Sequence, residues 1–134
     1  MSHDEPSPRF LTRDEALLLH GLAVAEFGGD PGIRDEALLD SALAQPRSTF
    51  GGKWLHEHPF EMAAAYAFHL ARNHPFIDGN KRIAWLAMRA FLLREGYQLR
   101  PGDERAVRTV LGAATGVHDK GHLAPWIERH ATPR

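Results

Sequence analysis

The chain has 134 residues, which suits one domain of common size and leaves no room for a second well-packed core. It contains no cysteine, and this excludes disulfides, thiolate metal sites and cysteine nucleophiles. A formal net charge of -1, from 16 basic and 17 acidic residues, argues against broad binding to nucleic acid or to an anionic membrane.

The chain begins with a polar, proline-containing segment. Residues 1–9, MSHDEPSPR, predict a disordered leader, and residues 10–134 predict a single domain. The leader lacks the basic start and apolar run of a secretory signal. No apolar stretch in the chain reaches the 18 or so residues that a membrane-spanning helix needs. We therefore expect a soluble, cytoplasmic protein.

Two helices are predicted in the first third of the chain. Thr12 and Glu15 form a capping-box pattern, and the helix that they begin should end near Phe27, before a glycine-rich segment. Residues 35–43 have leucines at helical spacing, and Pro46 stops this second helix soon afterwards.

Residues 47–55, RSTFGGKWL, have a different pattern. Residues that favour strands stand on both sides of a Gly-Gly pair, which predicts a short hairpin or flap.

Four more helices are predicted after the flap. Residues 59–73 are rich in alanine, and Pro59 suits a first helical position. The next helix should run over residues 80–95, with Gly96 as its C-terminal cap. The last two are predicted at residues 103–114, capped by Asp103, and 123–130. The fold class is therefore all-α, a compact bundle of about six helices with a short β-hairpin-like flap.

The nonapeptide HPFIDGNKR, residues 74–82, separates the two strongest helices. Pro75 disfavours the α conformation at His74, which places His74 in a loop. Gly79, Asn80 and Lys81 stand where the next helix begins, and the first amides of a helix have no partner within it. These amides point along the positive end of the helix dipole and favour an anion.

The side chains of the nonapeptide suit phosphate chemistry. Asp78 is a candidate ligand of Mg²⁺, which prefers carboxylates together with phosphate oxygens. Arg82 has a planar fork that fits phosphate oxygens, and His74 has the side chain best suited to proton removal near neutral pH. This set predicts phosphoryl or nucleotidyl transfer to a hydroxyl.

Structural explanations exist for the same residues. Asp, Gly and Asn are ordinary turn residues, and Asp78 and Arg82 have the spacing of a surface ion pair. For the nonapeptide as a whole, we favour a functional role over a purely structural one. His56, His58 and Glu61 form a second polar group, which we interpret as the start of a helix rather than a metal site.

The nonapeptide resembles the Fic-superfamily signature H-x-F-x-[D/E]-G-N-x-R, and in detail the Doc (death-on-curing) branch. Leu11-Thr12, FGGDPGIRDEALLDSALAQP from Phe27, the STFGG flap and LARNHPFIDGNKR extend the resemblance over about residues 10–100. It implies a Fic/Doc-type helical bundle.

The resemblance also implies roles for individual residues. His74 would take the proton from a serine or threonine hydroxyl, and Phe76 would be a buried anchor of the loop. Asp78 would bind Mg²⁺. The amides of Gly79, Asn80 and Lys81 would bind ATP phosphate, with help from the Asn80 side chain. Arg82 would neutralise the charge of the phosphate. In the flap, Thr49, Phe50 and Lys53 would align the target segment, although Phe50 and Trp54 packing on the body is an equal alternative.

Two positions separate possible reactions. Fic enzymes that transfer AMP usually have glycine at position 81 and an arginine at position 85, where this chain has Lys81 and Trp85. Doc-like proteins share the lysine and transfer the γ-phosphate, with translation elongation factor Tu as target. We therefore expect a Doc-like kinase that stops translation, with AMP transfer as the alternative.

Self-inhibition is not expected. The Fic self-inhibition motif is [S/T]-x-x-x-E-[G/N], and Glu95-Gly96 here has Phe91 in place of the serine or threonine. The resemblance thus implies a toxin of a type II toxin–antitoxin system, restrained by an antitoxin that inserts a C-terminal segment. A non-catalytic, Fic-like binding module is the rival interpretation. No direct contact with nucleic acid or membrane is expected.

Overall fold

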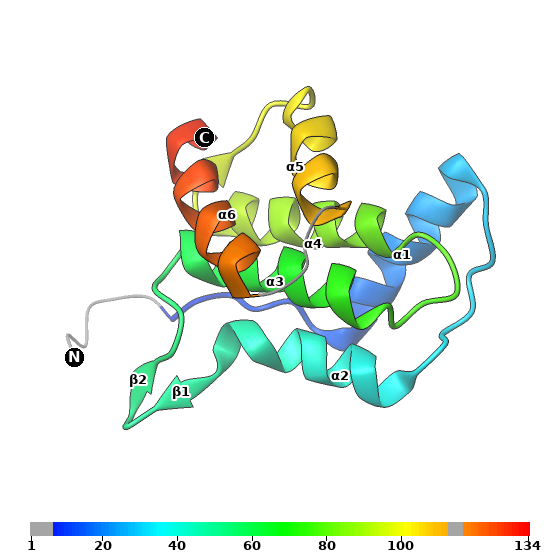
Figure 1. The fold of residues 1–134 in the computed structure, drawn as a ribbon, viewed down its shortest axis with the longest axis horizontal. Helices are drawn as coiled ribbons and strands as arrows, with labels where there is room; N and C mark the ends of the chain where they lie inside the picture. Colours follow the sequence, from blue (N-terminus) through cyan, green and yellow to red (C-terminus); the bar gives the residue numbers. More distant parts are fainter. Residues whose placement is uncertain (1–6, 113–116) are drawn as a thin grey trace.

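The computed structural model describes residues 7–112 and 117–134, which form six α-helices and two short strand pairs (Figure 1). The helices are α1 (Arg13–Phe27), α2 (Glu36–Ala44), α3 (Phe60–Asn73), α4 (Asn80–Arg94), α5 (Asp103–Gly112) and α6 (Val117–His130). A short 3₁₀ helix, Gln45–Arg47, follows α2. The predicted all-α bundle with a flap is confirmed. Within the described ranges, no helix is long and apolar enough to cross a membrane.

Helices α3 and α4 run side by side through the middle of the bundle (Figure 1). Helix α2 and helix α6 pack on α3, while α1 and α5 pack on α4. Alanine makes this close packing possible because its side chain keeps neighbouring backbones near one another. The buried alanines of α3 are Ala63, Ala64, Ala65, Ala67 and Ala71. Tyr66, Met62 and Leu70 fill the space around them and are fully buried.

The first two helices begin at the predicted caps. The Thr12 hydroxyl accepts a hydrogen bond from the Glu15 amide, and the Glu15 carboxylate accepts one from the Thr12 amide. The Asp35 carboxylate accepts a hydrogen bond from the Leu38 amide at the start of α2. These bonds satisfy amides that lack partners within the helices.

The predicted flap is a hairpin. Strand β1 (Thr49–Phe50) pairs antiparallel with β2 (Lys53–Trp54). Gly51 and Gly52 join them with φ values of 60° and 77°. A two-residue turn with two positive φ angles matches the twist of a hairpin and favours glycine at both positions.

Several predicted boundaries are wrong. Helix α6 begins at Val117 rather than residue 123, and it contains Pro125. Its contact with α3 buries Leu123 and Ile127, and this burial outweighs the low helix propensity of Gly121 and Pro125.

Two helix starts and one strand pair also differ from the prediction. Pro59 is the N-cap residue of α3, and Asp103 is the first residue of α5, where its carboxylate accepts a hydrogen bond from the Arg100 amide. Strand β3 (Tyr97–Gln98) pairs with β4 (Thr132–Pro133). The sequence gives little sign of this pair, because each strand has two residues and its partner is distant in the chain.

The predicted leader falls largely outside the described residues, which begin at residue 7. Within the described part of the leader, Arg9 forms an ion pair with Glu95. The predicted end of α5 at residue 114 also lies outside the described residues.

Candidate active site

The nonapeptide forms the connection between α3 and α4, at one end of the central helix pair (Figure 1). His74 ends α3 in a left-handed conformation, with φ of 48° and ψ of 55°. This backbone conformation is uncommon for a residue with a side chain and occurs often at functional sites. Gly79, with φ of 79°, precedes the first residue of α4. The predicted loop position of His74 and helix start at Asn80 are confirmed.

The Asn80 side chain forms hydrogen bonds with the backbone of the loop that precedes it. Its Oδ1 accepts a hydrogen bond from the Phe76 amide at 3.0 Å, and its Nδ2 donates one to the Phe76 carbonyl at 3.0 Å. The same Nδ2 lies 3.3 Å from Nδ1 of His74. Asn80 is therefore buried, with 7% of its surface exposed, and its side chain is engaged within the loop. The implied help of the Asn80 side chain in binding phosphate stays a prediction.

Phe76 and His20 anchor the loop to α1. Phe76 is 1% exposed, as expected for a buried anchor. Its ring stacks on the His20 ring with centroids 3.6 Å apart and an angle of 10° between planes. Nε2 of His20 lies 2.7 Å from the carbonyl oxygen of Asp78. The loop is thus attached to α1 by one apolar contact and one polar contact.

The segment between α1 and α2 holds the other side of the loop. Ile33 and Phe76 form an antiparallel β-bridge, and the Ile77 amide donates a hydrogen bond to the Gly32 carbonyl at 3.0 Å. Arg34 donates from Nε to the His74 carbonyl at 2.6 Å and from a terminal nitrogen to the Asn73 carbonyl at 2.9 Å. A cation at the end of α3 also matches the negative end of the helix dipole.

Two glycines permit this close approach. A Cβ added to Gly32 would lie 2.8 Å from Cδ1 of Ile77, and one added to Gly29 would lie 3.0 Å from Cβ of Asp78. Gly29 also has φ of 115°, which residues with side chains rarely adopt. The glycine-rich segment is therefore a scaffold for the nonapeptide.

Asp78 has one carboxylate oxygen engaged and one available. Oδ2 accepts a hydrogen bond from the Asp30 amide at 2.8 Å, which fixes the direction of the carboxylate. Among the described residues, Oδ1 has no partner. The residue is exposed to solvent. An oriented, exposed carboxylate fits a Mg²⁺ ion that takes its other ligands from water and phosphate.

The backbone amides of Gly79, Asn80 and Lys81 have no acceptor within the described part of the chain. No side chain caps the start of α4. Unpaired amides at a helix start, beside an exposed turn, form a site that fits the oxygens of a phosphate group.

Arg82 is largely buried, and its guanidinium contacts residues of α1 and α5. Its guanidinium donates to Oε1 of Glu104 at 2.9 Å, and its Cζ lies 3.4 Å from the centroid of the Phe27 ring. The Arg82 side chain is 17% exposed. Arg82, Phe27 and Glu104 also line a cavity of about 340 Å³ between α1, α4 and α5.

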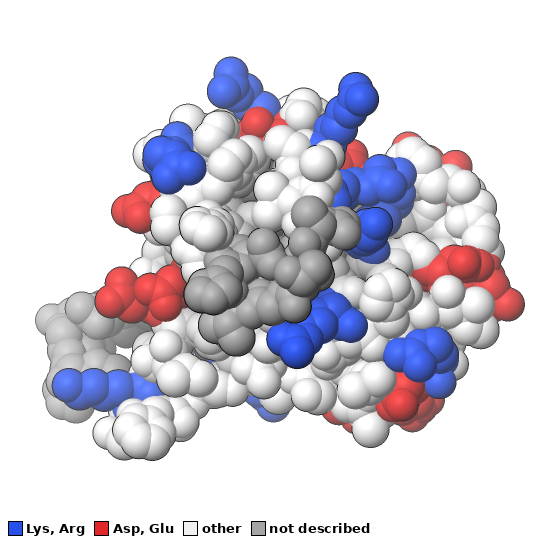
Figure 2. Space-filling view, in the orientation of Figure 1, with Lys and Arg blue, Asp and Glu red and all other residues white. Residues whose placement is uncertain are grey.

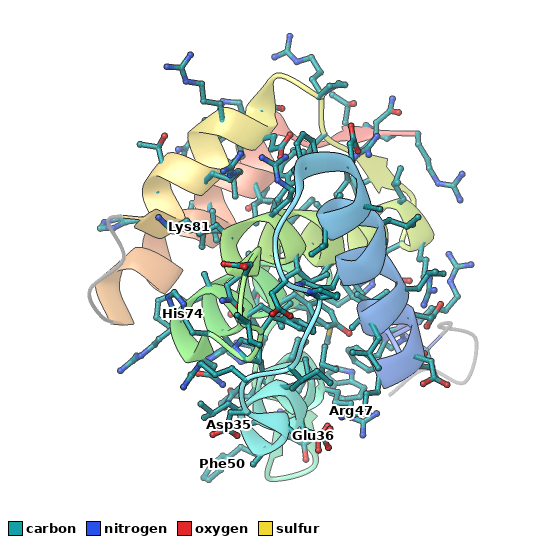
Figure 3. The ribbon with its side chains drawn as sticks, turned by 90° about the vertical axis from the view of Figure 1, so that its right-hand side faces the viewer. Asp35, Glu36, Arg47, Phe50, His74 and Lys81 are labelled. Carbon is teal, nitrogen blue, oxygen red and sulfur yellow. The ribbon has the colours of Figure 1, made fainter. Side chains whose placement is uncertain are left out.

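Figure 3 shows His74 and Lys81 on the same side of the molecule, one at the end of α3 and the other at the start of α4. Both residues are exposed. The Lys81 side chain forms no ion pair with any described residue. It is therefore available to a ligand at the helix start.

The flap lies at the other end of α3 from the nonapeptide (Figure 1). A 14-residue helix separates them, and such a helix is about 21 Å long. Thr49, Phe50 and Lys53 are exposed, and Phe50 is 82% exposed, so Phe50 does not pack on the body. Trp54 does contact the body, with its ring edge-to-face with Phe10 at 5.4 Å.

The second polar group lies apart from the nonapeptide. His58 pairs with Glu95, with Nε2 and Oε1 2.7 Å apart, at the end of α4 distant from Arg82. Among the residues that the structure describes, no group of three or more His, Cys, Asp or Glu side chains is arranged to hold a metal ion.

Positive and negative side chains are interspersed on the face in Figure 2.

Sequence reasoning missed His20, Arg34 and Glu104. His20 shares the buried face of α1 with Ala16 and Ala23, and a histidine on an apolar stripe was its signal. Arg34 and Glu104 had no distinguishing signal, because their partners are 40 and 22 residues away in the chain.

Comparison with known proteins identifies relatives of this chain. The model of the Fic/DOC family matches residues 10–92, which include the nonapeptide and the scaffold segment. The chain is 42% identical over 90 residues to the protein named Toxin Doc of Mycolicibacterium smegmatis, covering 67% of each chain. It is 31% identical over 121 residues to Protein kinase doc of Escherichia phage P1, covering 90% of this chain and 94% of that protein.

Proposed function

Because this chain belongs to the Fic/DOC family, we propose that it is a Doc-type toxin that transfers the γ-phosphate of ATP to a serine or threonine hydroxyl of a protein. The two relatives support the two halves of this proposal, since one is named a toxin and the other a protein kinase.

One observation carries the phosphate chemistry. The amides of Gly79, Asn80 and Lys81 lack acceptors among the described residues, and the oriented carboxylate of Asp78 directly precedes them. The amides would donate hydrogen bonds to the oxygens of the transferred phosphoryl group, and Asp78 would hold Mg²⁺. Mg²⁺ supplies positive charge that offsets the negative charge of the phosphate oxygens.

His74 is the proposed base. The target oxygen forms a bond to the γ-phosphorus while the bond from that phosphorus to the oxygen of ADP breaks. The hydroxyl proton passes to Nε2 of His74, which has no partner among the described residues. This role requires the tautomer with hydrogen on Nδ1, and the 3.3 Å contact between Nδ1 and Asn80 is then not a hydrogen bond.

Arg82 and Lys81 supply the remaining positive charge. Arg82 donates to Glu104, so phosphate oxygens would compete with that carboxylate for the Arg82 guanidinium or share the guanidinium with it. Lys81 is exposed beside the amides and would contact the phosphate chain directly. A bulky cation here disfavours the AMP-transfer arrangement and is the reason that we place the γ-phosphate at the amides.

The proposed biological role is arrest of translation in the cytoplasm, with elongation factor Tu as the target. An antitoxin would restrain the enzyme by inserting its C-terminal segment. The exposed flap residues Thr49, Phe50 and Lys53 would contact the target protein at a distance from His74.

The test is intact-mass analysis of elongation factor Tu after incubation with the protein, ATP and Mg²⁺. We expect a mass increase of about 80 Da, which reports one phosphoryl group. The variant His74→Ala should fold normally and produce no increase, because the target hydroxyl loses its base.

Other results would contradict the proposal. An increase of about 329 Da would identify AMP transfer. Unchanged mass in a mixture of cellular proteins, with tight binding of an antitoxin, would identify a non-catalytic binding module. Full activity of His74→Ala would exclude His74 as the base.

A further inference from the structure

His20 is a buried polar residue outside the nonapeptide that touches it twice. It lies on α1, is 2% exposed, and belongs to the buried face of that helix. Its ring stacks on Phe76 with centroids 3.6 Å apart, and its Nε2 lies 2.7 Å from the Asp78 carbonyl oxygen. The carbonyl accepts, so Nε2 must carry the hydrogen in this contact.

The Asp78 carbonyl belongs to the same peptide group as the Gly79 amide. In a trans peptide, the C=O and N–H groups point in opposite directions from one rigid plane. A hydrogen bond that directs the Asp78 carbonyl toward α1 therefore directs the Gly79 N–H away from α1. That N–H is the first of the unpaired amides at the start of α4.

Gly79 needs such an external restraint. Its φ of 79° is available to glycine at little cost, and glycine loses more conformational freedom than any other residue when its backbone is fixed. A Cβ at Gly79 would lie 3.4 Å from Nε2 of His20, which shows how closely the histidine approaches this peptide.

We propose that His20 is a positioning residue that orients the Asp78–Gly79 peptide, so that the Gly79 amide faces a phosphate group. The inference rests on the proposed function for the identity of the ligand, but the orientation of the peptide is a property of the free protein. The hydrogen bond carries this role, and the ring stacking on Phe76 holds the histidine in place.

Two substitutions separate the hydrogen bond from the stacking. His20→Phe keeps a flat ring against Phe76 but removes the donor. His20→Gln keeps a donor nitrogen at about the position of Nε2 but removes the ring. If the hydrogen bond positions the peptide, His20→Phe should lower kcat/KM about 100-fold, near the loss for one preorganised donor. His20→Gln should retain activity within about tenfold.

A matched control is available on α6. The His130 ring stacks on Trp126 with centroids 4.0 Å apart, and its Nδ1 lies 2.8 Å from the Trp126 carbonyl oxygen. His130→Phe therefore removes the same kind of bond at a position away from the nonapeptide. We expect it to change kcat/KM less than twofold.

The second measurement needs no activity. In ¹⁵N-labelled free protein, the Gly79 amide resonance should move in His20→Phe and remain near its wild-type position in His20→Gln. In wild-type protein, ¹H–¹⁵N correlation of the His20 ring should show hydrogen on Nε2. This measurement still decides the question if His20→Phe does not fold.

The outcomes distinguish the two proposals. An unprotonated Nε2, an unmoved Gly79 resonance in folded His20→Phe, or His20→Gln more impaired than His20→Phe would overturn the role of His20. If wild-type protein transfers no phosphoryl group, the proposed function fails, and the free-protein spectra still judge the orientation of the peptide.

Discussion

At the scale of single residues, the side chains of the nonapeptide divide into those that hold the loop and those that face solvent. Phe76 and Asn80 are buried and bonded within the loop or to α1. His74, Asp78 and Lys81 are exposed. The first group keeps the backbone in shape, and on the proposed function this would allow the second group to bind a substrate without rearrangement.

Lys81→Gly tests which phosphate group is transferred. The change removes an exposed cation beside the unpaired amides of α4, at a cost in helix stability of about 1 kcal/mol. We expect the product on the target protein to change from a mass increase of about 80 Da to one of about 329 Da. Lys81→Arg keeps the cation and should keep the smaller increase. An unchanged product with Lys81→Gly would remove this role from Lys81.

At the scale of elements, the segment between α1 and α2 fixes the end of α3. Arg34 donates to the carbonyls of both Asn73 and His74, and the adjacent backbone pairs with Ile77 and Phe76. The catalytic candidate His74 is thus held from a segment 40 residues earlier in the chain. Its unusual backbone conformation persists because several contacts determine it together.

Arg34→Ala should weaken both stability and transfer. It removes two hydrogen bonds to carbonyls at an exposed site, so we expect a loss of about 1–2 kcal/mol in unfolding free energy, measured by urea denaturation. The rate kcat should fall at least tenfold, because His74 loses its support. Arg13→Ala removes exposed ion pairs with Glu36 and Asp40 instead, and should change stability by about 0.5 kcal/mol or less. Equal kcat for the two variants would refute the supporting role.

Helix α5 contributes Glu104, which pairs with Arg82 and, on the proposed function, would compete with phosphate for it. Glu104→Gln keeps the size of the side chain and removes its charge, so Arg82 becomes freer to bind phosphate oxygens. We expect the KM for ATP to fall about fivefold, equivalent to about 1 kcal/mol for a partly exposed ion pair. Glu26→Gln makes the same charge change in the same cavity without an ion pair to Arg82 among the described residues. It should leave KM within twofold, and a rise in KM for Glu104→Gln would show that Glu104 supports Arg82 instead.

At the scale of the whole molecule, α3 connects the site to the body of the domain. Tyr66 lies at the middle of this helix, is fully buried, and accepts a hydrogen bond from the Leu11 amide at 2.9 Å. Burial raises the pKa of Tyr66 to about 12, although the Leu11 amide and Arg47 act in the opposite direction. The Tyr66 hydroxyl is thus one of the contacts that tie the chain before α1 to the core.

The raised pKa of Tyr66 predicts a loss of stability in alkali. The neutral phenol is favoured in the folded state, so its contribution is complete below pH 10 and is lost as the pH rises toward about 12. The size of this contribution is about 2–3 kcal/mol. Unfolding free energy measured by circular dichroism at several pH values should therefore fall more steeply for the wild type than for Tyr66→Phe. Parallel curves for the two proteins would contradict the prediction.

Much of the site could be predicted from sequence because its signals are local. A capping box, a Gly-Gly turn and a proline after His74 act within a few residues, so the six helices and the flap follow from short patterns. The start of α6 could not be predicted, because contact with α3 outweighs the propensities of Gly121 and Pro125. The pair of β3 and β4 has two residues in each strand and depends on distant partners.

The sequence by itself determined which groups are present for the proposed phosphate chemistry: a histidine, a carboxylate, free amides at a helix start, a lysine and an arginine, all within residues 74–82. Only the tertiary structure decided how each group is presented. His20, Arg34 and Glu104 contact the nonapeptide from distant parts of the chain, and such contacts leave no periodic signal in the residues that make them. His20 contacts the Asp78–Gly79 peptide, Arg34 contacts His74, and Glu104 contacts Arg82. These contacts exist because folding brings α1, the segment between α1 and α2, and α5 against the nonapeptide.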